Sequence, residues 1–131
     1  MAKKKTRTSM TTKLDELCKN IIRIRDNNTC QRCGKMAYGS DAHTSHIVCK
    51  GRGASKRRFD LLNLKLLCSH CHRFWWHKEP TESGKWFAEK FPARESYLEI
   101  YRGGKPCPIS DLEMEQAIED YKQKYKELKG E

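Results

Sequence analysis

Two cysteine pairs with C-x-x-C spacing constrain this chain more than any other feature. Cys30 and Cys33 form the first pair, and Cys68 and Cys71 form the second. A C-x-x-C turn supplies two thiolates to a tetrahedral metal ion, and two such turns complete a shell of four ligands. The spacing therefore predicts a structural zinc ion that joins two segments far apart in the sequence.

The alternative interpretation of these pairs is a redox dithiol or a chance arrangement. A thioredoxin-like site belongs beside alternating strands and helices, a pattern that this sequence does not have. The seven cysteines are an odd number, so they cannot all form intramolecular disulfides. The remaining three, Cys18, Cys49 and Cys107, are predicted to be small buried apolar residues.

Positive charge is concentrated in the first half of the chain. The 131 residues carry a formal net charge of +10. Residues 1–58 contain 15 Lys or Arg and 4 Asp or Glu, whereas residues 110–131 contain 4 and 7. This asymmetry favours a polyanionic partner such as nucleic acid. Lysines that serve only solubility are the alternative, and the clustering argues against it.

The chain has no run of about 18 apolar residues, and its basic start lacks the apolar stretch of a signal peptide. We therefore expect a soluble cytoplasmic protein that does not contact membranes. A reducing cytosol also favours a metal over disulfides at the paired cysteines.

Three parts are predicted along the chain: a basic flexible arm at residues 1–10, a core at 11–80 that begins with a helix, and a helical extension at 81–131. Thr11 or Thr12 is expected to cap the first helix. Its apolar residues recur at helical spacing and are Leu14, Leu17, Cys18, Ile21 and Ile24.

The two cysteine pairs are separated by 34 residues, more than the roughly 15–20 of a simple zinc ribbon. Residues 36–63 have no helical period and predict a strand, a Gly-rich basic turn and a returning segment. A helix is expected to start near Ser69 and to end before Pro80.

The extension after this core is predicted to be helical and to pack on the core or on a partner. Two short helices should stop at Pro92 and at Gly103. Ser110 and Glu113 have the spacing of a capping box at the start of the last helix. The apolar stripe of that helix comprises Met114, Ile118, Tyr121, Tyr125 and Leu128.

Within the core, the segments "HTSHIV", "NLKLLC" and "CHRFWWHKEP" resemble the HNH endonucleases, also called ββα-metal or His-Me finger nucleases. The resemblance extends from about Cys30 to Pro80 and is to the branch with four zinc cysteines. His46 corresponds to the first His of the family, Asn63 to its Asn and His72 to its last His. The resemblance implies an α+β fold with a small ββα-metal core, a four-cysteine zinc site and flanking helices.

The resemblance also implies a function, namely metal-dependent cleavage of phosphodiester bonds in DNA with 5′-phosphate and 3′-hydroxyl products. His46 is the expected general base, because a histidine can accept a proton near pH 7. Asn63 is expected to brace the loop or to orient that base. His72 is expected to hold the catalytic ion, which is Mg²⁺, Mn²⁺ or another divalent ion.

The sequence departs from the family at Ser45, where the family usually places an Asp, Glu or His ligand directly before the catalytic His. In a strand, residues 41, 43 and 45 share one side, so His43, and after it Asp41, are candidate replacements. His77 is a further candidate ligand. It is five residues from His72, about 140° away on an ideal helix, so the helix must loosen for both to bind one ion.

The Gly-rich turn is predicted to bind the DNA backbone. Its basic residues are Lys50, Arg52, Lys56, Arg57 and Arg58. A solvated loop is the alternative. The aromatic pair Trp75 and Trp76 could stack on bases, but adjacent helical residues face different directions, so at least one should pack in the core.

The expected partners are DNA and, because "RRFDLLN" and "HKEP" resemble small HNH proteins of bacteriophages, phage packaging or recombination proteins in the host cytoplasm. A monomer or weak dimer is expected. One site cuts one strand, so a double-strand break requires a dimer or two nicks. The alternative function is a zinc-dependent DNA-binding or adaptor module without catalysis, motivated by Ser45 and by the heptad-like last helix.

Overall fold

The computed structural model describes residues 6–131 and is built around a two-stranded antiparallel sheet. Strand β1 (Ala42–His46) pairs with β2 (Leu64–Cys68) in a register that sets Ser45 opposite Lys65. The first strand is where it was predicted, whereas the second begins only after residues 36–63, in which the returning segment was expected. The helices are α1 (Arg7–Arg25), α2 (Lys56–Phe59), α3 (Ser69–Cys71), α4 (Pro80–Lys90), α5 (Pro92–Leu98) and α6 (Asp111–Leu128). None of the helices described is both long and apolar enough to cross a membrane.

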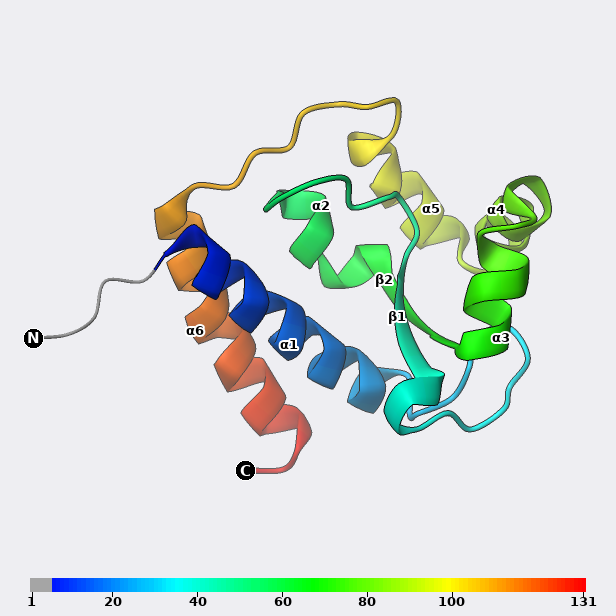
Figure 1. Ribbon diagram of the computed structural model, residues 1–131, viewed down its shortest axis with the longest axis horizontal. Helices are drawn as coiled ribbons and strands as arrows, with labels where there is room; N and C mark the ends of the chain where they lie inside the picture. Colours follow the sequence, from blue (N-terminus) through cyan, green and yellow to red (C-terminus); the bar gives the residue numbers. More distant parts are fainter. Residues whose placement is uncertain (1–5) are drawn as a thin grey trace, which may run out of the picture.

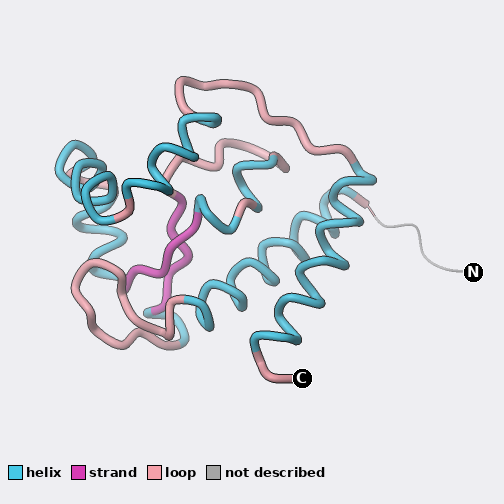
Figure 2. Tube along the Cα trace, turned by 180° about the vertical axis from the view of Figure 1, so that it is seen from behind, coloured by secondary structure: helices cyan, strands magenta, loops and turns pink. Residues whose placement is uncertain are grey.

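The sheet lies between two groups of helices. Figure 1 shows α1 and α6 on one side of the strands and α3, α4 and α5 on the other. Seen from behind in Figure 2, the two short strands cross in the middle of the molecule. All five residues of β2 are buried, so this strand forms the centre of the core. The arrangement is a mixed helix and small-sheet fold compatible with the predicted α+β class.

Helix α1 begins at Arg7, so the predicted start after Thr11 or Thr12 is wrong. The backbone N–H of Ser9 donates to the Thr6 hydroxyl at 3.0 Å, and the Thr6 N–H donates to the Ser9 hydroxyl at 3.1 Å. This reciprocal pair is a capping box with Ser in the place where Glu or Gln is usual. The pair Thr6 and Ser9 therefore does not match the usual sequence pattern for the start of a helix.

The predicted flexible arm, residues 1–10, overlaps this helix, so the prediction is wrong for residues 7–10. Residues 7–10 form the first turn of α1, and Met10 is buried there. Residues 1–5 lie outside the described part of the chain. Burial of Met10 against the rest of the core explains why helix continues to this point, since an amphipathic face stabilises a helix more than propensity does.

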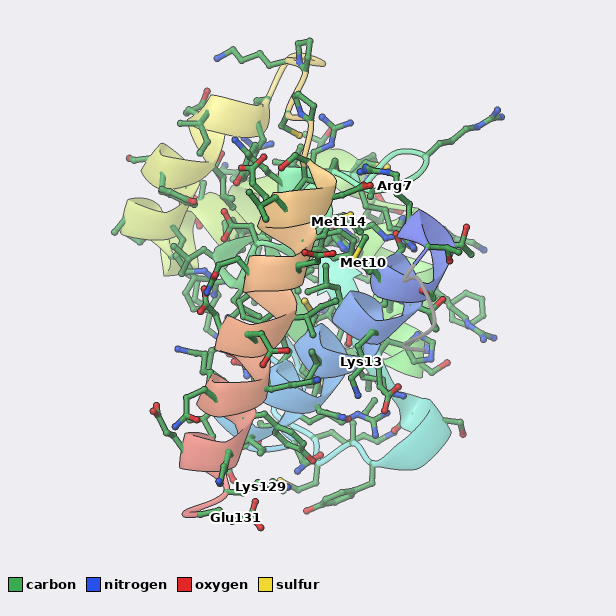
Figure 3. The ribbon with its side chains drawn as sticks, turned by 90° about the vertical axis from the view of Figure 1, so that its left-hand side faces the viewer. Arg7, Met10, Lys13, Met114, Lys129 and Glu131 are labelled. Carbon is green, nitrogen blue, oxygen red and sulfur yellow. The ribbon has the colours of Figure 1, made fainter. Side chains whose placement is uncertain are left out.

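Helices α1 and α6 pack against each other. Figure 3 shows Met10 of α1 and Met114 of α6 beside each other between the N-terminal parts of the two helices. The capping box predicted at the start of α6 is confirmed, because Ser110 and Glu113 each bind the backbone N–H of the other. Met114 and Ile118 are buried, whereas Leu128 is 40% exposed. The apolar stripe of α6 is thus covered by the core at the start of the helix and exposed at its end.

The connection between the strands contains a short helix that the sequence did not predict. Helix α2 follows Ser55, whose hydroxyl accepts from the Arg58 N–H at 3.3 Å. Phe59 at its end is buried in the core. The Gly-rich segment before α2 is the open part of the connection, and the basic residues after it belong to a folded element.

After the second cysteine pair, α3 continues into a π-helical turn, His72–Trp76. The His77 N–H donates to the His72 carbonyl at 3.3 Å, the five-residue hydrogen bond that defines this geometry. The predicted helix from Ser69 to a point before Pro80 is confirmed in position. Trp75 and Trp76 are both buried, which meets the expectation that at least one packs in the core.

The three unpaired cysteines differ in environment. Cys18 is buried and Cys107 is half-buried, whereas Cys49 is exposed. The prediction of a buried residue is therefore wrong for Cys49, which lies in the Gly-rich connection after β1. A small apolar residue in a polar, glycine-containing loop has no core within reach.

Replacing Met114 with Ala should lower the free energy of unfolding by about 2–5 kcal/mol, because the fully buried side chain leaves a cavity between α1 and α6. Leu112 is the matched control on the same helix and is 75% exposed, so Leu112→Ala should change stability by about 0.5 kcal/mol or less. Urea denaturation of the two variants measures the difference. Equal effects would contradict the packing described for α6.

Candidate active site

The four predicted zinc cysteines come together in one cluster. Their sulfur atoms all lie within 4.8 Å of one another, and the Cys33 and Cys68 Sγ atoms are 3.9 Å apart. A tetrahedral ion with Zn–S bonds of about 2.3 Å requires S–S separations of about 3.8 Å. The cluster therefore has the size and donor set to hold a metal ion such as zinc.

Each cysteine pair is presented by a tight local structure. Gly34, with φ of +79°, closes the turn after Cys33, and the turn is flanked by a bridge between Thr29 and Met36. Cys68 ends β2 and caps α3, so that its sulfur accepts from the Cys71 N–H at 3.4 Å. The cysteine cluster thus brings the first turn next to the junction of strand and helix.

The protonation of the cluster depends on a bound cation. Burial acts to raise the pKa of Cys30, but backbone N–H groups from Cys33, Cys68 and Arg32 outweigh it and lower that pKa to about 7. Burial raises the pKa of Cys71 to about 12. Four thiolates so close together need a cation to compensate their charge, and metal binding releases the remaining protons.

His46, the predicted general base, ends strand β1. Its Nε2 lies 3.0 Å from the carbonyl oxygen of Arg58. Because a carbonyl only accepts, Nε2 of the neutral ring carries the proton, and Nδ1 keeps its lone pair. Burial, opposed by this hydrogen bond and assisted by Lys50, lowers the pKa of His46 to about 4. The ring is therefore neutral near pH 7 and has one nitrogen free to accept a proton.

Asn63 is fully buried and braces the connection between the strands. Its side-chain oxygen accepts from the Val48 N–H at 2.8 Å, and its amide donates to the carbonyls of Val48 and Arg57, both at 2.9 Å. These bonds join the two ends of the loop that carries the His46 hydrogen-bond partner, Arg58.

His72 lies between two other histidines. Its Nδ1 is 2.9 Å from Nδ1 of His43, and its Nε2 is 3.0 Å from Nε2 of His77. His43 also contacts the Ser40 carbonyl through Nε2 at 3.0 Å. Burial, followed by the charges of His77 and His43, lowers the pKa of His72 to about 4, so this ring is neutral near pH 7.

These contacts specify the tautomers. His43 Nε2 donates to the Ser40 carbonyl, so His43 Nδ1 accepts the proton from His72 Nδ1. The lone pair of His72 therefore lies on Nε2 and faces His77. The three rings form a chain rather than a convergent cluster, because His72 uses a different nitrogen for each neighbour. One ion can bind His72 with His43 or His72 with His77.

The π-helical turn explains how His77 reaches His72. On an ideal α-helix these residues would be far apart around the axis, whereas a hydrogen bond across five residues brings position i+5 back over position i. The ring centroids are 4.6 Å apart. The loosening of the helix that the sequence required for this pair is therefore present.

Asp41 and Ser45 are used elsewhere. The Asp41 carboxylate accepts from the Ser69 N–H at 3.0 Å and pairs with Lys35 at 3.0 Å, so both of its oxygens lie at the start of α3. Ser45 is fully buried and accepts from the Lys65 ammonium nitrogen at 2.9 Å. The hydroxyl in the usual ligand position thus binds a lysine.

Lys65 is the residue of this region that the sequence did not single out. It is fully buried on β2, with Nζ 3.1 Å from the centroid of the Trp76 ring. Burial, and then the charge of Arg94, lower its pKa well below the usual value. A single lysine within the apolar run "LKLLC" was the available signal. The side chain connects Ser45 of β1 with the π-helical turn.

Three of the five predicted DNA-binding residues are engaged in the fold. Arg58 forms a two-point pair with Asp15 at 3.1 and 2.7 Å, and Arg57 donates to the carbonyl of Lys105 at 3.2 Å. Lys56 forms an exposed pair with Glu113 at 3.5 Å. Lys50 and Arg52 form no ion pair within residues 6–131. The ion pairs of the described chain are Arg7–Asp111, Arg25–Asp26, Lys35–Asp41, Lys56–Glu113, Arg58–Asp15, Arg102–Glu95, Arg102–Glu99, Lys122–Glu119 and Lys129–Glu131.

A cleft of about 510 Å³ gathers several of these groups. His46 enters it from β1, His72 and His77 from the π-helical turn and the residue after it, and Lys50 from the loop. His43 is outside its lining. The cleft therefore combines a neutral imidazole base, a pair of facing imidazoles and a free cation, which together suit the chemistry of a phosphate ester.

A family model described as HNH endonuclease matches residues 30–74. The match begins at Cys30, the first cysteine of the cluster, and includes His46, Asn63 and His72, but not His77. Neither the curated proteins nor the solved structures contain a match to the chain. The family match indicates a nuclease or DNA-binding function.

Cys68→Ala should abolish tight metal binding at the cysteine cluster, because three thiolates do not complete the tetrahedral shell. Cys49→Ser is the control, since Cys49 is exposed and lies outside the cluster. Elemental analysis after dialysis without added metal should find about one zinc fewer per chain in Cys68→Ala than in the control. Equal zinc contents would contradict the assignment.

The depressed pKa of His46 makes stability depend on pH. Below its ordinary pKa of about 6.5 the unfolded ring takes up a proton, whereas the folded ring stays neutral down to about 4. The free energy of unfolding should therefore fall as the pH drops from 7 to 5, and it should fall less in His46→Gln. Urea denaturation at both values, with zinc content checked, measures this. A greater fall in the variant would contradict the sign.

Proposed function

We propose that this protein is a metal-dependent endonuclease that hydrolyses phosphodiester bonds in DNA. The observation that carries this proposal is the common cleft of His46, with its free Nδ1, and the facing Nε2 atoms of His72 and His77. The family match at residues 30–74 supports the same reaction. Hydrolysis requires both groups, a base for water and positive charge for the phosphorane.

His46 acts as the general base. Its Nδ1 takes a proton from the attacking water, and the Arg58 carbonyl holds the ring through Nε2. The same carbonyl stabilises the imidazolium that forms, since it accepts from the positively charged ring. Asn63 supports this geometry indirectly, because it fixes the loop between Val48 and Arg57.

His72 and His77 would hold the catalytic ion. Their Nε2 atoms are 3.0 Å apart, close enough to bind one ion together. When bound, the ion supplies charge stabilisation to the phosphate and to the leaving oxygen. His43 orients His72 through Nδ1, the role of a hydrogen-bonded neighbour to a metal-binding histidine. Asp41 has no part in this arrangement.

The nature of the ligands bears on the choice of ion. Imidazole nitrogen suits transition metals such as Mn²⁺, Co²⁺, Ni²⁺ and Zn²⁺, whereas Mg²⁺ prefers oxygen ligands and keeps its waters. We therefore rank Mn²⁺ and the later transition metals ahead of Mg²⁺ as catalytic ions. The separate cluster of four thiolates suits structural zinc.

Binding of the DNA backbone is assigned to Lys50 and Arg52, with Lys56 in a weaker role because its exposed ion pair with Glu113 is easily exchanged. The site acts on one strand, so a monomer nicks and a dimer is needed for a concerted double-strand break. Phage origin, a role in packaging or recombination, and cytoplasmic location stay predictions from the sequence.

A DNA-binding module without catalysis is the second candidate function. The observation that favours it is Ser45, whose hydroxyl binds Lys65 in the position where the family usually has a metal ligand. In this alternative the histidine chain is structural, and the basic loop binds DNA without cleaving it.

His46→Ala should reduce nicking of supercoiled plasmid by about 100-fold or more, the contribution typical of a general base. His70→Ala is the control, because His70 is exposed and contacts Phe74 rather than the cleft. The assay compares EDTA, Mg²⁺, Mn²⁺, Co²⁺ and Ni²⁺ with zinc-loaded proteins. Ion-dependent nicking by the control and not by His46→Ala supports the endonuclease, whereas DNA binding without nicking under any ion would favour the binding module.

A further inference from the structure

The cleft beside His46 has an apolar part that the proposed hydrolysis does not use. Ile47, Trp76, Pro80 and Gly84 contribute to its lining together with the histidines. Its volume of about 510 Å³ is within the range of sites that bury small ligands, about 300–1,000 Å³. A phosphate and an ion fill only a fraction of this space, so the cleft has room for a further part of the substrate.

The charges around the cleft select an anionic strand. Its lining, taken over residues 6–131, contains no Asp or Glu. Lys50 is exposed there and unpaired within those residues, while Arg102 is compensated by Glu95 at 2.7 Å. The apolar surface is therefore bordered by a free cation and by imidazoles, an arrangement that fits a nucleotide with its phosphate at the histidines and its base on the apolar wall.

The cleft is open on the side of helix α4. Gly84 of this helix is exposed, and a Cβ built on it would meet nothing within 4 Å. Trp76 lies in the same lining and is 9% exposed. Lys65 covers one face of its ring at 3.1 Å, so the exposed part of the ring is the surface that a nucleobase can contact.

Paired DNA cannot use this surface. Bases in a duplex are stacked and present only their edges, so a base face reaches an apolar cleft only when the nucleotide is unpaired and unstacked. The apolar lining therefore favours unpaired over paired DNA and does not select a base sequence.

A second hollow continues the path on the other side of His46. It has a volume of about 250 Å³ and shares Thr44, His46 and Lys50 with the cleft. Lys19 of α1 also lines it and is exposed. Asp15 lines it too, but its carboxylate is paired with Arg58 at 2.7 Å, so Lys19 and Lys50 are the cations of this hollow without a carboxylate partner in residues 6–131. A strand that crosses β1 at His46 would place one neighbouring phosphate beside Lys19 and the next nucleotide in the cleft.

We propose that the cleft binds an unpaired nucleotide of the substrate strand next to the scissile phosphate, so that the protein acts on single-stranded or locally unpaired DNA in preference to duplex. This inference rests on the proposed endonuclease function and specifies its substrate. Lys19 is assigned as a further phosphate contact on the opposite side of His46.

The test compares binding of a fluorescent single-stranded oligonucleotide, the same strand in full duplex, and a duplex with three unpaired nucleotides. Fluorescence anisotropy is measured on zinc-loaded protein without added divalent ion, and a gel confirms that the DNA stays intact. The single strand and the interrupted duplex should bind about tenfold or more tighter than the full duplex, as expected for one stacked base.

Gly84→Leu fills the open space from the α4 side and should weaken binding of the single strand about tenfold while leaving duplex binding unchanged. Thr81→Leu is the matched control, because Thr81 is exposed on the same helix and lies outside the cleft lining. Leucine is a better helix former than glycine, so Gly84→Leu should melt at no lower temperature than wild type.

Equal binding of single strand and duplex, or equal effects of Gly84→Leu and Thr81→Leu, would overturn the inference. Ion-dependent plasmid nicking that Gly84→Leu leaves unchanged would overturn it too, while the endonuclease function stands. If wild type binds none of the three DNAs and nicks no plasmid, the proposed function fails together with the inference.

Discussion

The closure of the four-cysteine cluster is the constraint on which the rest of the site depends. It joins the turn that carries Cys30 and Cys33 to the junction of β2 and α3 at Cys68 and Cys71. His43, His46 and Asn63 lie between these points, and His72 and His77 follow within six residues of Cys71. A domain of this size buries limited apolar surface, so a metal ion bound to this cluster would contribute stability that the short strands alone lack.

The strand register and the helix geometry then divide the polar groups between structure and chemistry. Ser45 faces Lys65 across the sheet and is buried, while His46, the next residue, projects to the cleft. The π-helical turn brings His77 over His72 at 3.0 Å. A regular α-helix would have separated these rings, so a local irregularity of the backbone creates the pair of nitrogens that the proposed metal site requires.

Much of the positive charge in this protein is used inside the fold. Arg58 is paired with Asp15, Arg57 binds the connector at Lys105, and Lys65 is buried against Trp76. Lys50 and Arg52 are the loop cations without such partners in residues 6–131. The net charge of +10 therefore overstates the surface available to a polyanion, and the location of the unpaired cations is more informative than their number.

The sequence by itself determined the two C-x-x-C pairs and the capped last helix, because these depend on local spacing and on residues a few positions apart. It also identified His46, Asn63 and His72 by their resemblance to a family, and their roles stay proposals. Only the tertiary structure decided how the cysteine pairs and the two strands meet, which histidine nitrogens face each other, that Asp41 binds the Ser69 N–H and Lys35, and that Arg58 is paired. Those outcomes depend on contacts between distant segments and on a π-helical turn, and neither leaves a periodic signal in the chain.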